Sequence, residues 1–256
     1  MITLKSPAEI TAMREPGRAV AAVLADVTAA AVPGVTLRSL DERARAVLAE
    51  HGARSTFLGY QPGFASVPFP AVICASVNDA ALHGIPDGYP LRSGDVLSVD
   101  CGAEIGGWAG DAAVTLTVGQ AGPSDSRLVD TTRRALEAGI AAAQAGGRLG
   151  DIAHAIGTVG RAAGYGINTD FGGHGIGEHM HEEPTVPNEG RPGRGLPLRP
   201  GLVLAIEPWF MAGGRDGYRI DDDGWTLRSA DGSRAAHVEH TVAVTDDGPR
   251  ILTLPR

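Results

Sequence analysis

The chain has 256 residues, a formal net charge of -8 and two cysteines, with 43% hydrophobic and 20% charged residues. This composition is typical of a folded globular protein and excludes collagen-like, coiled-coil and largely disordered chains. The acidic balance disfavours direct binding to nucleic acid or to an anionic membrane, and two cysteines suit a reducing compartment. Because the N-terminus shows no signal-peptide pattern, we expect a cytoplasmic protein. From the chain length, we expect a single domain, residues 1–256.

The N-terminal part of the chain predicts helices followed by a loop. Ser6 precedes a proline and a capping-box glutamate, which is the pattern of a helix start. We expect this helix to run to about residue 30 and to be kinked or split at Pro16-Gly17, and a second helix to cover about 36–51. Residues 53–70 carry aromatic side chains and prolines without a dominant period, so they predict an aromatic loop of the kind that shapes pockets.

The rest of the chain alternates between β-rich and helix-rich stretches. The predicted strands are 71–77, 96–104, 109–118, 201–210, 218–220, 225–229 and 236–244, and the predicted helices are 124–145 and 149–163. The order of helices, strands, helices, strands favours one α+β unit built from two comparable halves.

Asp100 and Asp111 are the first pair of residues that suggests chemistry. They lie on two predicted strands joined near Gly106, so a hairpin places them roughly opposite each other. Facing carboxylates repel unless a cation neutralises them, and an unpaired carboxylate is out of place in the apolar strand before Asp100. The simpler alternative is that either side chain points to solvent or caps a turn.

A glycine- and histidine-rich segment, residues 172–184, is the second candidate. Glycines flank His174 and leave its imidazole accessible, and His181 follows in the same segment. Glu207 and Glu239 each stand inside an otherwise apolar or β-branched predicted strand. With the two aspartates they supply four carboxylates and one imidazole, a set that suits Mn, Fe(II), Co or Zn and fits two ions better than one.

Together these residues resemble the motif set of the type I methionine aminopeptidases, which have the pita-bread fold. The resemblance spans nearly the whole chain. It rests on His83-Gly84, Asp100, Asp111, Gly173 to Gly177, His181-Glu182-x-Pro184, Ile206-Glu207-Pro208 and Glu239-His240-Thr241. The resemblance implies two pseudo-symmetric halves with a curved antiparallel sheet covered by helices. It also implies that Asp100, Asp111, His174, Glu207 and Glu239 bind two divalent ions.

The same resemblance implies an activity, which is removal of the initiator methionine from nascent proteins with a small second residue. A hydroxide between the two ions would attack the peptide, Glu207 would move the proton, and His181 and His83 would bind substrate and stabilise the reaction. Nascent polypeptide N-termini are the implied partners of a monomer, the ribosome is a further candidate partner, and no membrane is involved.

The resemblance places an apolar pocket for the methionine side chain at Tyr60, Phe69, Cys74 and Trp225, although ordinary core packing would equally explain each residue alone. The chain departs from the family pattern at Met180, where an aromatic residue is expected, and in a longer stretch 61–70. Both departures concern the shape of this pocket.

Two other readings share the fold. Prolidases and aminopeptidase P resemble the catalytic half of the chain, but they usually carry a further N-terminal domain, and only about eighty residues precede His83 here. A non-catalytic binding protein of the same fold would have lost metal ligands, whereas all five are present. We therefore expect the aminopeptidase.

Overall fold

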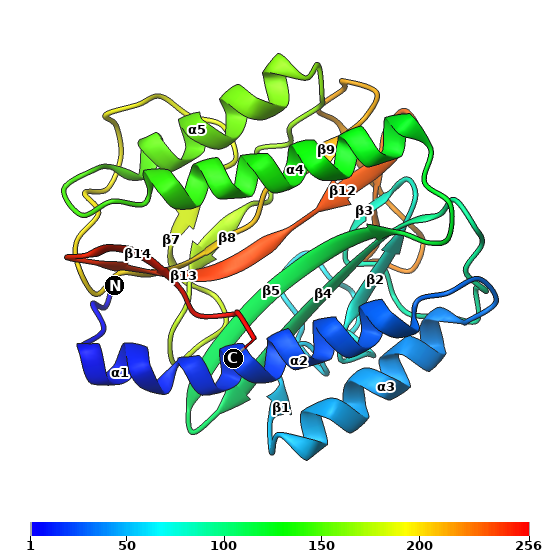
Figure 1. Cartoon of the computed structure of the whole chain (residues 1–256), viewed down its shortest axis with the longest axis horizontal. Helices are drawn as coiled ribbons and strands as arrows, with labels where there is room; N and C mark the ends of the chain where they lie inside the picture. The colour runs from blue at the N-terminus through cyan, green and yellow to red at the C-terminus, as the bar shows by residue number, and fades with distance from the viewer. Residues whose placement is uncertain (1, 256) are drawn as a thin grey trace.

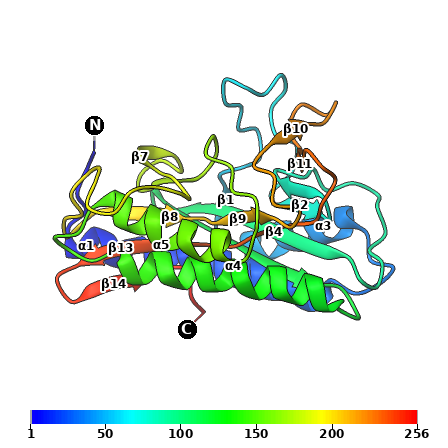
Figure 2. The same ribbon diagram turned by 90° about the horizontal axis from the view of Figure 1, so that it is seen from above.

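The computed structural model describes residues 2–255 and shows a curved antiparallel sheet with helices packed along one face (Figure 1). The helices are α1 (Pro7–Ala12), α2 (Arg14–Ala30), α3 (Leu37–Glu50), α4 (Pro123–Ala142) and α5 (Leu149–Ala162). Seen from above, α4 and α5 lie along one face of the sheet (Figure 2). None of the helices within residues 2–255 is long and apolar enough to cross a membrane.

Two long strands, β4 (Val96–Ile105) and β5 (Trp108–Thr117), form the centre of the larger sheet. Its other strands are β1 (Arg54–Ser55), β2 (Cys74–Val77), β6 (Gly173–Gly175), β7 (Glu182–Val186), β8 (Val203–Ile206), β13 (Glu239–Thr245) and β14 (Gly248–Ile251). The order is β1-β4-β5-β13-β8-β6-β7, with β2 on β4 and β14 on β13. The pairing of β5 with β13 joins the two halves of the chain.

Two smaller sheets lie beside the large one. The first has the order β10-β11-β3 and contains β3 (Ala80–Leu82), β10 (Tyr218–Ile220) and β11 (Leu227–Ser229). The second pairs β9 (Trp209–Met211) with β12 (Ala235–His237). The expected strand 201–210 is therefore interrupted between Ile206 and Trp209, where the chain leaves one sheet for another.

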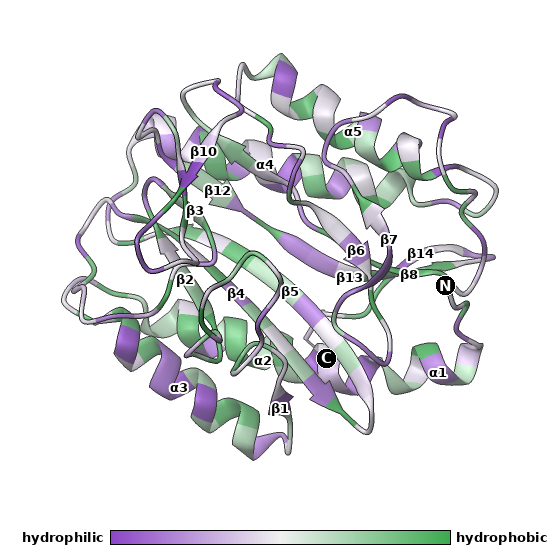
Figure 3. Ribbon diagram, turned by 180° about the vertical axis from the view of Figure 1, so that it is seen from behind, coloured by the Kyte–Doolittle hydropathy of each residue, from purple (hydrophilic) through white to green (hydrophobic). Residues whose placement is uncertain are grey.

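Each half of the molecule has its own apolar core between helices and sheet. In the first half, α2 and α3 bury Val23, Leu40 and neighbouring side chains against β2, β4 and β5. In the second half, α4 and α5 bury Leu128, Ile152 and Ile156 against β8 and β13. Hydrophobic and hydrophilic residues alternate along β4 and β5 (Figure 3), because one face of these strands packs on helices and the other does not. One curved antiparallel sheet with a helix-covered core in each half agrees with the expected α+β class.

The N-terminal helix starts at the predicted residue but breaks earlier than predicted. The Ser6 side chain accepts the Glu9 N–H, and the Glu9 carboxylate accepts the Ser6 N–H, so the capping box is present. The helix is interrupted at Met13 and not at Pro16. Proline has no N–H to donate to the carbonyl four residues earlier, at Ala12, so the disruption appears one turn before the proline itself.

Candidate metal centre

A cavity of about 490 Å³ opens between the central strands and the loops around residues 57–69 and 170–185. Every side chain that the sequence singled out as a site residue lines it. These are Tyr60, Phe69, Cys74, His83, Asp100, Asp111, His174, His181, Glu207, Trp225 and Glu239. The fold thus brings together residues that are up to 179 positions apart in the chain, from the first loop to β13.

The two aspartates share one face of the β4–β5 hairpin but are not directly opposite each other. Asp100 pairs with Ala113, and Asp111 pairs with Gly102, so the carboxylates are diagonal neighbours. The two aspartates, expected to lie roughly opposite each other, are therefore offset by two residues along the ladder. The reason is the two-residue turn at Gly106 and Gly107, both at positive φ, which fixes the register of the strands.

Three side chains from different strands come together beside this hairpin. Asp111, His174 and Glu239 offer ligand atoms that all lie within 4.8 Å of one another. The His174 Nδ1 lies 2.9 Å from the Gly175 carbonyl oxygen, where a protonated Nδ1 would donate and leave Nε2 free. That Nε2 lies 3.6 Å from Oε1 of Glu207, which follows the end of β8.

The carboxylates of this cluster repel one another in a buried setting. Burial raises the pKa of Asp100 and Glu239 well above the ordinary values, and nearby carboxylates add to the effect. Burial and Glu207 raise the pKa of Asp111 to about 8. For Glu207 burial acts in the same direction, but the nearby His237 and His174 rings outweigh it and lower its pKa.

Several polar atoms of the cluster have no hydrogen-bond partner within residues 2–255, although they are buried. They are Asp100 Oδ1, Asp111 Oδ1, Glu239 Oε1 and His237 Nε2. Buried polar atoms without a partner are costly, and oxygen atoms gathered around imidazole nitrogens are the donors that divalent transition-metal ions prefer. The residues present therefore fit a divalent metal centre.

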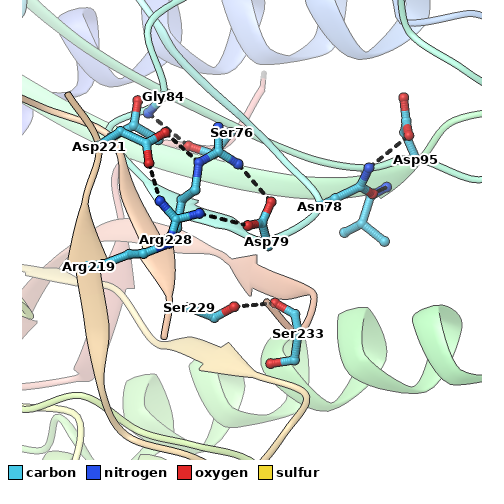
Figure 4. A network of polar contacts seen from close by, with 12 residues as sticks. Ser76, Asn78, Asp79, Gly84, Asp95, Arg219, Asp221, Arg228, Ser229 and Ser233 are labelled. Carbon is cyan, nitrogen blue, oxygen red and sulfur yellow. Dashed lines mark hydrogen bonds and ion pairs between the residues drawn. The ribbon is translucent and has the colours of Figure 1, made fainter. Parts of the chain in front are cut away.

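His83 projects into the cavity from the end of β3, in a strained backbone conformation with φ 57°. Burial lowers the pKa of this imidazole to about 4, so the ring is neutral at pH 7. The segment that carries it is held by polar contacts shown in Figure 4. Ser76 accepts the Gly84 N–H, and Arg228 on β11 bonds to Asp79 at 2.7 Å just before β3.

His181 lies in the same cavity, and the centroid of its ring is 4.3 Å from that of His174 and 5.2 Å from that of Tyr60. The residue is solvent-exposed. The next residue, Glu182, accepts a hydrogen bond from the buried ammonium group of Lys5 at 2.6 Å. This ion pair ties the segment that carries His181 to the N-terminus of the chain.

The expected pocket residues form one apolar cluster beside the metal-facing side chains. Phe69, Cys74 and Trp225 pack with Met180, and Tyr60 lies at the edge of the cluster. Trp225 donates its indole N–H to a loop carbonyl at 2.9 Å, which fixes the ring. Met180 therefore contributes to this wall, and all four pocket candidates lie within reach of the same cavity.

Sequence reasoning missed three residues of the site. Phe64 stacks on the His83 ring with centroids 5.9 Å apart, and Phe171 meets the same ring edge-on. Phe64 lay within the predicted aromatic loop, but nothing distinguished it from its neighbours there. The third is His237, which forms a second cluster with Glu207 and Glu239. Its position two residues before Glu239, at the spacing of one strand face, was the available signal.

The cavity thus combines a cluster that fits divalent metal ions with an apolar pocket beside it. The sequence model of the family described as Metallopeptidase family M24 matches residues 11–246, and the chain belongs to this family. The resemblance inferred from the motifs is confirmed.

Named relatives agree with this family. The chain is 51% identical to methionine aminopeptidase 1 of Mycobacterium tuberculosis, over 99% of this chain and 96% of the relative. The crystal structure of methionine aminopeptidase from Thermotoga maritima superposes with a TM-score of 0.94 at 39% identity and covers 99% of this chain and 100% of the other. A prolidase from Pyrococcus furiosus is similar in fold alone, with a TM-score of 0.76, 18% identity, and 66% of its length covered.

Proposed function

We propose that this chain is a methionine aminopeptidase that removes the initiator methionine from nascent polypeptides with a small second residue. The observation that carries the proposal is the meeting, in one cavity, of a carboxylate–imidazole cluster and an apolar pocket. The named relatives support the same reaction, since the match covers 96% and 100% of their lengths.

The proposed centre holds two divalent ions, of Co, Mn, Fe(II) or Zn. Asp100, Asp111, His174, Glu207 and Glu239 would hold them, since these side chains face one another and leave buried oxygen atoms without partners. Bound divalent ions lower the pKa of water and polarise a carbonyl group, which is the chemistry that peptide hydrolysis requires.

The remaining steps belong to side chains of the chain itself. Glu207, whose pKa is lowered, is ionised at neutral pH and would accept the proton of the attacking water, then deliver it to the leaving amine. His83, neutral at pH 7, and the exposed His181 would hydrogen-bond to the substrate peptide from two sides of the cavity. The aromatic wall at Tyr60 and Trp225 would bind the methionine side chain and exclude water.

The proposal extends to the setting of the enzyme. We propose that residues 1–256 form a single catalytic domain and act as a monomer in the cytoplasm. The substrates would be N-termini of nascent polypeptides, with contact to the ribosome where these chains emerge. No bound nucleic acid or membrane is required by this reaction.

The test is a peptide panel assayed with metal-free protein to which each divalent ion is added in turn. We expect release of free methionine from Met-Ala and Met-Gly peptides, and much slower release from Met-Leu peptides. A parallel set of Xaa-Pro dipeptides examines the alternative activity of the same fold. Cleavage of Xaa-Pro dipeptides without methionine release would contradict the proposal, as would an absence of peptidase activity with every ion.

A further inference from the structure

His237 is held rigidly at the end of β12, in the wall of the metal centre. Its side chain is buried, and the residue is 2% exposed. The backbone N–H donates to the Thr115 hydroxyl at 2.9 Å, and the same hydroxyl donates to the His237 carbonyl at 2.5 Å. The Cα position is therefore fixed from both sides of the peptide, and the imidazole has little freedom to leave the cluster.

The imidazole Nε2 of His237 points at two metal-facing carboxylates. It lies 3.5 Å from Oε2 of Glu207 and 4.0 Å from Oε2 of Glu239. No hydrogen-bond partner is found for this nitrogen among the described residues, although it is buried. A buried imidazole nitrogen without a partner is costly unless a ligand completes it.

The distance from the His237 Nε2 to Glu207 is close to the distance from the His174 Nε2 to the same carboxylate. The Nε2 of His174 lies 3.6 Å from Oε1 of Glu207, so each oxygen of this carboxylate faces one imidazole nitrogen. Ligand bonds of about 2.0–2.2 Å place neighbouring ligand atoms of one ion roughly 3–4 Å apart. A hydrogen bond between His237 and Glu207 would instead bring these atoms to about 2.7–3.2 Å.

We propose that His237 is a nitrogen ligand of the metal centre, in a second ligand group made of Glu207, His237 and Glu239. The first group, Asp111, His174 and Glu239, shares Glu239 with it. This assignment rests on the proposed function in one respect: the ions that His237 would bind are the ions of the proposed reaction. It gives the centre an imidazole on each side of Glu207, which favours Zn, Fe(II) and Co over Mg and Ca.

The test counts the imidazoles that bind metal, and it does not depend on activity. Purified protein is loaded with Co(II), and the strongly shifted imidazole ring protons are recorded by NMR. They are assigned by repeating the experiment on protein made with ring-deuterated histidine. We expect two shifted rings in the unaltered chain, one in His237→Gln and one in His174→Gln. The exposed His154→Gln is the matched control and leaves both rings in place.

Glutamine can still donate a hydrogen bond to Glu207 but is a poor metal ligand, so His237→Gln separates the two roles. A single shifted ring in the unaltered chain, unchanged in His237→Gln, would mean that His237 only positions Glu207 and would overturn the proposal. If the glutamine variant does not fold, the count in the unaltered chain and in His174→Gln decides. Methionine release is measured on the same samples: two shifted rings without release would contradict the proposed function and leave the ligand assignment standing.

Discussion

The hydroxyl of Ser76 accepts the backbone N–H of Gly84 at 3.0 Å, in a fully buried position next to His83. The Gly84 carbonyl in turn accepts the Ala75 N–H at 2.8 Å, so both polar groups of Gly84 are bound to the chain around β2. A side chain at Gly84 would collide with the Ala75 carbonyl oxygen. These contacts hold His83 in its left-handed conformation, with the ring directed into the cavity.

Ser76→Ala is therefore expected to disturb His83 without touching the substrate. The variant leaves a buried N–H unpaired, which costs about 1–3 kcal/mol of folding free energy. Because relaxation of Gly84 moves the His83 ring, kcat for a Met-Ala peptide should fall more than KM rises. Steady-state kinetics and urea unfolding check both effects.

The matched control is Ser229→Ala, which removes another buried serine hydroxyl that bonds to a backbone carbonyl. It should lower stability while leaving kcat close to that of the unaltered chain. An equal loss of kcat in both serine variants would show that general destabilisation, and not the position of His83, causes the effect.

The sequence predicted the composition of the site better than its geometry. Carboxylates inside apolar strands are conspicuous, because burial makes an unpaired charge unfavourable, and this drew attention to Asp100 and Glu239. The register of the hairpin was the harder part, since a shift of two residues separates opposed from diagonal aspartates. The two glycines of the turn carried the information that fixes it.

Short elements were the part of the fold that the sequence pattern did not reveal. The strand β6 contains only Gly173, His174 and Gly175, and glycine has a low strand propensity. It forms because His174 pairs with Ala205 on β8 and with Thr185 on β7, and such distant pairing leaves no local periodicity. His237 was overlooked for a similar reason, since its role depends on Glu207, which follows the end of β8 and is distant in the sequence.

Asp111→Asn is expected to remove metal binding while preserving the fold. In the metal-free protein burial raises the pKa of Asp111 to about 8, so this carboxyl is mostly protonated at pH 7, and the neutral asparagine should leave stability unchanged or higher. A saturating ion should stabilise the unaltered chain by about 2.7 kcal/mol at one hundred times its Kd, and the variant far less. Thermal melting with and without added Co(II), together with metal content, measures this.

The exposed Asp246→Asn serves as the control for charge alone and should keep the metal-dependent rise in melting temperature. Methionine release should disappear in Asp111→Asn only. Full activity and full metal content in that variant would remove Asp111 from the proposed ligand set.

Phe64→Ala is expected to weaken substrate binding through the aromatic wall. Phe64 is 42% exposed, so its loss should cost little stability, but its ring stacks on His83 and meets Trp225 edge-on. Such aromatic contacts are worth about 0.5–1.5 kcal/mol, which corresponds to a rise in KM of roughly two- to tenfold. Kinetics on Met-Ala peptides give the value of KM.

The control is Val67→Ala, in the same loop and similarly exposed, which should leave KM unchanged. An unchanged KM in Phe64→Ala would exclude this ring from the substrate pocket.

Arg161 is expected to make stability depend on pH at a site remote from the metal centre. Its guanidinium donates two hydrogen bonds to Glu189 and two to Asp216, and Asp216 also accepts the Ile167 N–H. Hydrogen bonds from Arg161 lower the pKa of both carboxyl groups below their ordinary values. A carboxyl group with a lowered folded-state pKa adds stability above its unfolded-state pKa, and this contribution is lost as the pH falls through the folded-state pKa.

The difference in stability between the unaltered chain and Arg161→Gln should therefore be complete at pH 7 and should shrink below about pH 4.5, the ordinary range of these carboxyl groups. All three side chains are partly exposed, so solvent screening limits the difference at pH 7 to about 1 kcal/mol. Urea unfolding at pH 7, 5, 4 and 3 measures this difference in stability.

The control is Arg191→Gln, at an exposed arginine without an ion pair among residues 2–255, which should show no such pH dependence. A difference that stays constant from pH 7 to pH 3 would mean that Arg161 stabilises the fold by packing and not through its charge.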